Sequence, residues 1–583
     1  MKKRILSFVL VIVLCISQFG CGVKKAKRTI YDGEDFDLFC EELFKDDLRD
    51  SPVNTRYKLK NPEVYGIEFD EEDYVYPFYT MEDIRETNEK VKDNIARLKC
   101  FDRESLSEVQ KINYDNIEWL FNNSIMSEDE YYMYNMISPL QGVIVNLSID
   151  FMEYPISNET DIKNYLHILT SLPDLANNLE DFLFEQVKRG YFPSDFVVDE
   201  NISNIDKMIN SGFISYVDGF NAKAEKIGLN DKALKENLQT NEEYVEKYVK
   251  PAYLKMKDTL TSLKGSTKHE GRAIDYGKEY LDFFEKSIRI DNGVDMSVDE
   301  IKDYLINRYK KLSDKFILLA MNNYDEFAEI SELKLDYDSN SDIVEELIDF
   351  SNMRLNSDFT NGFQISYMVK SCEIDGVLAY YLNSALDDLS DNIIRVNKSY
   401  SDLSSIDNYI TVSHESAPGH MLMHNGVCLA GKLCNFNLNN SNLGANEGWA
   451  EFSSYLALDN LVKKGKITQI QKEMYILYRR MIRVIESACA ILVHYYGYSA
   501  KQLNETFSGT ALTLEYEMIY KDLISGGKTS IPYAFGPEKV FDIYEKAGED
   551  REELFFDFML TYGCMPISLL EKWSDQFCQS AKK

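Results

Sequence analysis

Two short segments in the second half of the chain carry the side chains that divalent metals bind. The first is His414-Glu-Ser-Ala-Pro-Gly-His420, and the second is Glu447-Gly-Trp-Ala-Glu451. Zn²⁺ binds imidazole nitrogen and carboxylate oxygen, and a catalytic site normally has three protein ligands and leaves a fourth position for water. His414, His420 and Glu447 can supply those three ligands. The two segments therefore predict a zinc site.

The spacing of the two histidines requires a break in the helix. Where two histidines are four residues apart, both rings lie on one helical face, and a glutamate after the first histidine acts as the base; Glu415 has that position here. His414 and His420 are six residues apart, which separates them by roughly 240° around a straight helix. Pro418 has no N–H to donate and its ring clashes with the carbonyl of His414, while Gly419 permits backbone angles that other residues avoid. We therefore predict a kinked or broken helix that returns His420 to the metal.

A second histidine pair and a second carboxylate leave alternatives open. His420 and His424 are four residues apart and would share a helical face without any break. Glu447 and Glu451 are also four apart and lie on the same side of a helix. One carboxylate can bind the metal while the other holds the second ring N–H of a ligating histidine, which fixes its orientation. We assign Glu447 to the metal and Glu451 to the histidine.

The two motifs resemble a family of bacterial proteins classed as a domain of unknown function, number 885, which carries HExxPGH followed by EGWA. That family is similar to the zinc metallopeptidases whose third ligand is a glutamate. The resemblance extends through the second half of the chain, at Asp391–Asn397, Ile531–Gly536 and Gly563–Pro566, and is thin before about residue 350. Two positions depart from it: Met421 stands where many members have a histidine, and Ala490–His494 replaces an Asp-x-Gly-x-His pattern.

The resemblance implies a role for each matching residue. It implies His414, His420 and Glu447 as zinc ligands, Glu415 as general base, and Tyr533 and His494 as further catalytic residues of the pocket. In such a site zinc polarises a water and the scissile carbonyl, while Glu415 removes the water's proton and delivers it to the leaving amine. When the water attacks, the carbonyl oxygen becomes an oxyanion, and a hydrogen-bond donor within about 3 Å of that oxygen stabilises it. Tyr533 is the first candidate for that donor and His494 the second.

A short segment before the motifs predicts a strand. Asn392–Asn397 contains Ile393, Ile394 and Val396, whose branched side chains favour extended backbone. If the strand has a free edge near the metal, a peptide can pair with it through main-chain hydrogen bonds. An ordinary buried strand fits the same residues.

The N-terminus has the pattern of an export signal. A basic start, Met1–Arg4, precedes an apolar run at 5–16, and about 12 apolar residues fall short of the roughly 20 that span a membrane. Gly20-Cys21 resembles a bacterial lipoprotein cleavage site, although Gln18 stands where leucine is usual. We predict a signal peptide at 1–20, a lipid on Cys21 and a tether at 21–35, so that the protein is exported and faces outward from the cell membrane.

The rest of the chain predicts a mainly α fold with a large two-lobed, metallopeptidase-like helical body and a small β element beside the active-site cleft. With 12 prolines and 28 glycines, no Ser/Gly/Pro tract divides the body. We place a helical N-terminal lobe at 36–350 and a helical catalytic lobe with the metal site at 351–583. Apolar residues recur at helical steps in several segments. These segments are 89–98, 161–186 with a break at Pro173, 205–221, 241–263, 298–322 with a capping box at Ser297 and Glu300, 468–496 and 538–546.

Charge and cysteine content limit the partners. The chain has 64 basic and 97 acidic residues, a net charge of −33, which opposes binding to nucleic acid and anionic lipid. Cys428 and Cys434 can bridge the loop after the first motif or remain free thiols.

From the two motifs and the export signal together, we predict a zinc-dependent peptide hydrolase at the cell surface, held to the membrane by its lipid. The alternatives are a non-catalytic lipoprotein that binds peptide or another ligand, and a hydrolase of another amide or ester.

Overall fold

The computed structural model describes residues 33–139, 141–330, 333–355, 362–370, 373, 377–526 and 530–580. The predicted signal peptide, the lipid site Cys21 and most of the tether lie outside these ranges. Most of the described residues are helical, as predicted, and three short strands form one sheet. Within the described ranges, no helix combines the length and the apolar composition needed to cross a bilayer.

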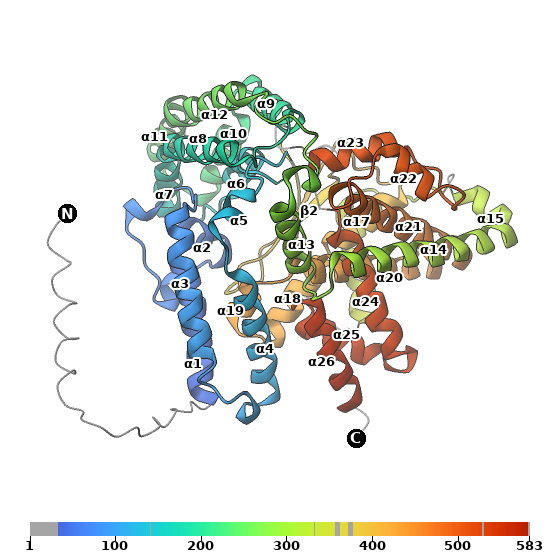
Figure 1. Ribbon diagram of the computed structural model, residues 1–583. Helices are drawn as coiled ribbons and strands as arrows, with labels where there is room; N and C mark the ends of the chain where they lie inside the picture. Colours follow the sequence, from blue (N-terminus) through green and yellow to red (C-terminus); the bar gives the residue numbers. More distant parts are fainter. Residues whose placement is uncertain are drawn as a thin grey trace, which may run out of the picture.

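The helices enclose three hydrophobic cores (Figure 1). The smallest lies under α1 (Gly33–Arg49), α3 (Met81–Leu98) and α4 (Glu108–Ser124). The second fills the N-terminal lobe, which contains α2 (Pro52–Lys58), α5 (Glu128–Met133), α6 (Val143–Glu153), α7 (Glu159–Thr170), α8 (Leu172–Arg189), α9 (Asp195–Asn210), α10 (Ile214–Ala224), α11 (Asp231–Tyr244) and α12 (Lys250–Leu263).

The third and largest core belongs to the C-terminal lobe. Its helices are α13 (Lys278–Asn292), α14 (Val298–Asn322), α15 (Tyr324–Glu329), α16 (Asn340–Arg354), α17 (Ile406–Glu415), α18 (His420–Ala430), α19 (Asn435–Asn439), α20 (Leu443–Lys463), α21 (Gln469–His494), α22 (Ala500–Thr506), α23 (Tyr516–Gly526), α24 (Pro532–Ala547), α25 (Glu552–Tyr562) and α26 (Ile567–Ser580). Because Leu263 belongs to the second core and Phe284 to the third, the cores divide between α12 and α13. The sequence placed the lobe boundary at residue 350.

Local sequence signals explain several helix ends. Ser297 and Glu300 form the predicted capping box of α14. The predicted break at Pro173 is confirmed, because α7 ends at Thr170 and Pro173 lies in the first turn of α8. The predicted helix at 205–221 is helical over most of its length but is broken in the middle. There the chain leaves α9 after Asn210, and Phe213 takes the left-handed conformation before α10.

The sheet contains β1 (Phe363–Tyr367), β2 (Ala379–Leu382) and β3 (Asn392–Val396) in the order β1-β3-β2. β1 runs parallel to β3, and β2 runs antiparallel to it. The predicted strand at β3 is confirmed, and Ile394 and Val396 are buried. β3 is the middle strand, however, so both of its edges are already paired and it cannot accept a peptide.

Several contacts hold the two lobes together around the sheet. The guanidinium of Arg395 on β3 pairs with Glu153 at the end of α6. The N–H of Leu386, in the loop after β2, donates to the carbonyl of Lys58 at 2.8 Å. Lys60 pairs with Asp388 in the same loop. The segment that follows α2 is therefore fixed against the loop between β2 and β3.

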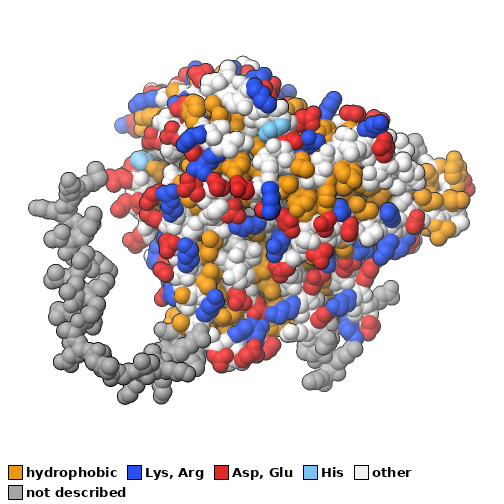
Figure 2. Space-filling view, viewed as in Figure 1, with side chains coloured by type: hydrophobic (Ala, Val, Ile, Leu, Met, Phe, Trp, Pro, Cys, Tyr) orange, Lys and Arg blue, Asp and Glu red, His pale blue; other side chains and the backbone are white. Residues whose placement is uncertain are grey.

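Acidic and basic side chains are interspersed over the face seen in Figure 2. The exception is the end of α14 with α15, at the right edge of that view, where hydrophobic side chains gather. Leu318, Met321 and Tyr324 are exposed there.

Candidate metal centre

The predicted break in the helix is confirmed, between α17 and α18. α17 ends at Glu415, and α18 begins at His420. The N–H of Gly419 donates to the carbonyl of Ser413 at 3.1 Å, so the chain folds back against the end of α17. A Cβ on Gly419 would overlap the carbonyl oxygen of His414, and only glycine allows this close approach. The indole N–H of Trp449 donates to the carbonyl of Pro418 at 2.9 Å and fixes the turn from the side of α20.

Three side chains from the two motifs converge beside this break. The Nε2 atom of His414 lies 3.2 Å from Oε2 of Glu447, and Nε2 of His420 lies 3.6 Å from the same oxygen. The two imidazole rings are perpendicular, at 89°, with centroids 4.7 Å apart. One nitrogen or oxygen atom from each of the three residues lies within 4.8 Å of the others. Such a group of donors is compact enough to surround one divalent cation.

The electrostatics of the group also favour a cation. Burial alone would lower the pKa of His414, but its contacts with Glu447 and Glu451 raise it to about 10. Burial opposes ionisation of Glu447, yet His420 and His414 bring its pKa down to about 2. Oε2 of Glu447, the oxygen that faces both imidazoles, is buried without a hydrogen-bond partner among the described residues. The buried carboxylates therefore need positive charge, which a divalent cation at this point would supply in place of a proton on His414.

The second carboxylate of the EGWAE segment lies behind His414. Oε2 of Glu451 is 3.3 Å from Nδ1 of His414, and its Oε1 accepts a hydrogen bond from the hydroxyl of Tyr455 at 2.6 Å. Arg479 on α21 is 3.5 Å from the same carboxylate. The sequence motif did not point to Tyr455 or Arg479. Tyr455 follows Glu451 by one helical turn and was detectable by that spacing, whereas Arg479 reaches the site only through the packing of α21.

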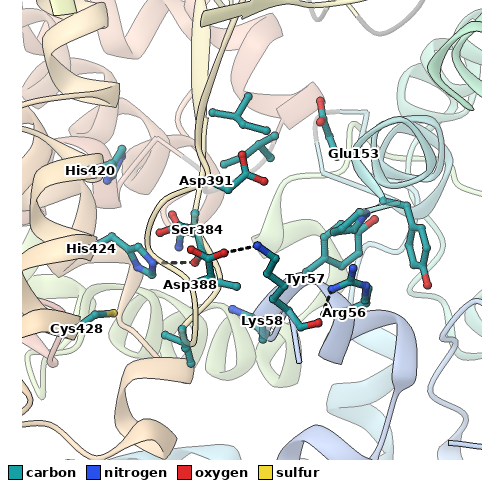
Figure 3. A pocket seen from close by; sticks show the side chains of 18 of the residues that line it. Arg56, Tyr57, Lys58, Glu153, Ser384, Asp388, Asp391, His420, His424 and Cys428 are labelled. Carbon is teal, nitrogen blue, oxygen red and sulfur yellow. Dashed lines mark hydrogen bonds and ion pairs between the residues drawn. The ribbon is translucent and has the colours of Figure 1, made fainter. Parts of the chain in front are cut away.

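The alternative histidine pair is not brought together. His424 lies one turn after His420 on α18, but its Nε2 contacts the carbonyl of Ser384 at 3.0 Å. Burial lowers the pKa of His424 to about 4. Figure 3 shows His420 and His424 on the same wall of a cavity, with His424 directed at Ser384. His424 is therefore neutral and is used as a hydrogen-bond donor to the backbone.

Glu415 lies between the helix break and the sheet. Its Oε2 accepts a hydrogen bond from the backbone N–H of Tyr381 on β2 at 2.9 Å. The side chain is buried, and burial raises the pKa of its carboxyl group above the usual range. β2 is thus the strand beside the candidate site, which the sequence did not indicate.

Tyr533 lies in the first turn of α24, where burial, together with the nearby carboxylates of Glu447 and Glu415, raises the pKa of its hydroxyl. It reaches that position because α24 packs closely against α20. At the crossing, the Cβ of a residue replacing Gly448 would lie 2.9 Å from backbone atoms of Gly536, and a Cβ on Gly536 would overlap the carbonyl oxygen of Gly444. The glycines allow the two helix backbones to touch, which brings Tyr533 close to Glu447, the predicted metal ligand.

His494 lies elsewhere. Arg483 on α21 is close enough to Tyr533 to influence its pKa, and His494 follows eleven residues later, about 16 Å further along the helix axis. Its Nε2 contacts the carbonyl of Leu523 at 3.0 Å and its ring packs against Phe284. His494 lines a second cavity of about 270 Å³. The structure therefore does not bring His494 together with the other predicted site residues.

A cavity of about 530 Å³ opens beside His420, between the two lobes (Figure 3). One wall comes from the segment after α2, the end of α6 and α10. The opposite wall comes from the sheet, the loop between β2 and β3, and α18. The cavity is large enough for several residues of a peptide, and the candidate metal centre lies at its side.

Comparison with known proteins identifies relatives by fold and by family. The structure resembles a protein from Colwellia psychrerythraea described as a lipoprotein candidate, with a TM-score of 0.77, 14% identity, and coverage of 94% of this chain and 100% of that one. It also resembles a lipoprotein candidate of unknown function from Shewanella oneidensis, with a TM-score of 0.63, 15% identity, and coverage of 92% and 99%. No curated protein sequence matches the chain. The sequence model of one family matches residues 63–572, so the chain belongs to the family described as "Bacterial protein of unknown function (DUF885)".

Proposed function

We propose that this protein is a zinc-dependent peptide hydrolase. The observation that carries the proposal is the convergence of His414, His420 and Glu447, whose donor atoms lie within 4.8 Å of one another, next to the buried carboxyl group of Glu415. Two imidazoles and one carboxylate form a donor set typical of catalytic zinc, which keeps a further position for water. Bound there, zinc would lower the pKa of a water molecule to about 7 and polarise a carbonyl group.

Glu415 is suited to move the proton of the attacking water. Burial raises the pKa of its carboxyl group, which makes the carboxylate a stronger base, and the N–H of Tyr381 holds Oε2 in place. The same group can then deliver the proton to the leaving amine. The hydroxyl of Tyr533, which lies close to Glu447 and Glu415, is a candidate donor to the carbonyl oxygen as negative charge develops on it.

Two features support a peptide as the substrate. β2 is an edge strand among the described residues; the N–H of Tyr381 on this edge is bound to Glu415, and an extended peptide can pair with the rest of the edge. The cavity beside His420 offers about 530 Å³ for the residues that flank the cleaved bond. A peptide in this position would present its carbonyl groups to the candidate metal centre.

The experiment that tests the proposal combines metal analysis with turnover. Purified protein is expected to contain about one zinc per chain, and to cleave members of a peptide library. Glu415→Gln should retain the zinc while the rate of hydrolysis falls by a factor of about 10² to 10⁴. Glu200→Gln, an exposed position on α9, serves as the matched control and should behave as the wild type. Absence of zinc, or unchanged hydrolysis in Glu415→Gln, would falsify the proposal.

A protein that keeps its zinc and binds peptides without cleaving them would instead be a binding lipoprotein. Cleavage of esters or other amides but not of peptides would mean that the protein is a hydrolase of one of those substrate classes. We further propose that the protein is exported and held to the membrane by a lipid on Cys21, which the description of both structural relatives as lipoprotein candidates supports. Cys21→Ala should move the protein from the membrane fraction to the soluble fraction.

A further inference from the structure

The cavity between the lobes is lined by more basic than acidic side chains. Its basic residues are Arg56, Lys58, Lys60, Lys223, Lys226 and Arg395, and its acidic residues are Glu153, Asp388 and Asp391. Basic side chains thus outnumber acidic ones in the lining, whereas the whole chain has 33 more acidic than basic residues. The excess is smaller than the count, because Asp161, outside the lining, offsets Arg56 and burial lowers the pKa of Lys223 to about 7. A cavity of opposite sign to the protein that contains it attracts an anionic ligand.

Most of these cations already have partners. Arg56 binds Asp161 through two nitrogens, at 3.1 and 2.9 Å, and Arg395 binds Glu153 in the same manner. Lys60 pairs with Asp388. These cations hold the walls of the cavity together and carry no charge that is free for a ligand.

Lys223 is also committed to the protein. Its ammonium group donates to the carbonyls of Phe151, Met152 and Tyr154 at 2.9 to 3.1 Å. These three carbonyls end α6, so Lys223 caps the helix and fixes the wall that carries Glu153.

Lys58 is different. Among the described residues its ammonium group forms no hydrogen bond and no ion pair within 4 Å, and the carboxylate of Asp47 influences it only at longer range. Burial lowers its pKa, so the wall around it offers less solvation than water does. Its backbone is fixed, because its carbonyl accepts the N–H of Leu386 at 2.8 Å. A positioned, poorly solvated ammonium group gains more from a carboxylate than an exposed one does.

Lys58 faces the wall that carries the metal centre. Its charge acts on His424, one turn after His420 on α18, and in Figure 3 its amino group points toward the side of the cavity formed by His424 and Cys428. One helical turn of four residues advances about 6 Å, and an extended peptide advances about 3.3 Å per residue. Because Lys58 faces His424, one turn beyond His420, a carboxylate bound by Lys58 would belong to a residue two or more positions from a bond held near His420.

We propose that Lys58 is a specificity-determining residue that binds a carboxylate of the peptide, two or more residues from the bond that is cleaved. This inference rests on the proposed function for the identity of the ligand as a peptide. The carboxylate is either the C-terminal carboxylate or the side chain of an aspartate or glutamate. His424 does not compete for it, because its ring is neutral and bound to the carbonyl of Ser384.

The test uses the full-length protein and a set of alanine–phenylalanine hexapeptides. One peptide has a free C-terminus and its twin has a C-terminal amide; further amidated peptides carry a single glutamate, or a glutamine in the same place, at successive positions. The dissociation constant of each peptide is measured by calorimetry on zinc-loaded Glu415→Gln protein, so that no turnover is needed. Values of kcat/KM are measured on the wild type.

We expect peptides with the carboxylate to bind about 10-fold to 100-fold more tightly than their amide or glutamine twins, as hydrogen bonds to charged groups do. Lys58→Gln should remove this preference and leave the neutral peptides unchanged, while Lys58→Arg should retain most of it. Lys235→Gln, an exposed position on α11, is the matched control and should keep the full preference. The free-acid and glutamate peptides separate the two sources of the carboxylate.

Equal affinities for charged and neutral peptides would overturn the inference. So would a loss in Lys58→Gln that is the same for both kinds of peptide, since that result marks a structural role. Binding that depends on Lys58 without any hydrolysis by the wild type would refute the proposed function and leave the carboxylate site standing. Hydrolysis without a carboxylate preference would refute the carboxylate site and leave the proposed function standing.

Discussion

His414 lies at the centre of the candidate site, because both of its ring nitrogens face a carboxylate. Nε2 lies near Glu447 and Nδ1 near Glu451, so one carboxylate can share a cation with the ring while the other accepts its N–H. The tautomer is then fixed with the proton on Nδ1. Glu451 is in turn held by Tyr455 and Arg479.

This arrangement makes a prediction about Glu451. Glu451→Gln should weaken zinc binding by about 10-fold to 100-fold, because an amide holds the ring N–H less strongly and lowers the basicity of His414. Competition with a chelator measures the change. Glu473→Gln, exposed on α21, is the control. An unchanged zinc affinity in Glu451→Gln would show that this carboxylate does not support the ligand.

At the scale of elements, the crossing of α20 and α24 sets the distance between Glu447 and Tyr533. Gly536→Ala should force the helices apart, because a Cβ at this position overlaps the carbonyl oxygen of Gly444. We expect a loss of about 1 to 3 kcal/mol in the free energy of unfolding, as for other overpacked cores. Denaturant titration measures the loss.

The matched control is Gly219→Ala in α10. Its Cβ would meet only Met152, at 3.4 Å or more, which is ordinary contact. Replacing a helical glycine by alanine without a clash should stabilise the protein by about 0.5 to 1 kcal/mol. Equal effects of the two substitutions would mean that the close packing of α20 and α24 is not what Gly536 provides.

The elements also show how far the sequence could predict the site. The break after Glu415 was predictable because proline and glycine act locally, within one turn of the histidines. The strand at β3 was predictable from its branched residues. That β3 is the middle strand depends on its pairing with residues 363–367 and 379–382, and the residues of β3 themselves do not indicate which segments pair with it. The edge at β2 and the partner of Glu415 were therefore missed.

The sequence also could not predict the positions of residues that depend only on the packing of distant elements. His494 was a candidate only through the family resemblance, and the length of α21 places it away from the predicted metal ligands. Lys58 could not be proposed as a ligand-binding residue from the sequence, because it lines a cavity that forms only where the two lobes meet. What the sequence determines well are side chains within one motif, and what it leaves open is which distant elements face that motif.

At the scale of the whole molecule, His494 lies where the two lobes meet. The second cavity, which it lines, has one side formed by residues 133–141 and 191–197 and the other by 271–287 and the end of α21. Burial lowers the pKa of His494 to about 4, although the contact with the carbonyl of Leu523 opposes the shift. The ring is therefore neutral in the folded protein at pH 7.

Acid should destabilise the protein through this ring. Between about pH 6.5 and pH 4 the unfolded chain binds a proton at His494 that the folded chain does not, so the free energy of unfolding falls as the pH is lowered through that window. A difference of 2.5 pKa units corresponds to about 3 kcal/mol. His494→Gln should lose this part of the pH dependence, with pH 8 as the reference for its packing cost. Parallel curves for variant and wild type would contradict the prediction.

The turn between α17 and α18 has a consequence for how such proteins are recognised. A search for paired histidines that assumes one continuous helix accepts separations of three or four residues and rejects six. Here the intervening Pro-Gly pair restores the alignment that the longer separation would lose. Patterns that allow a variable gap whenever it contains proline followed by glycine should therefore recover chains that fixed-gap patterns discard.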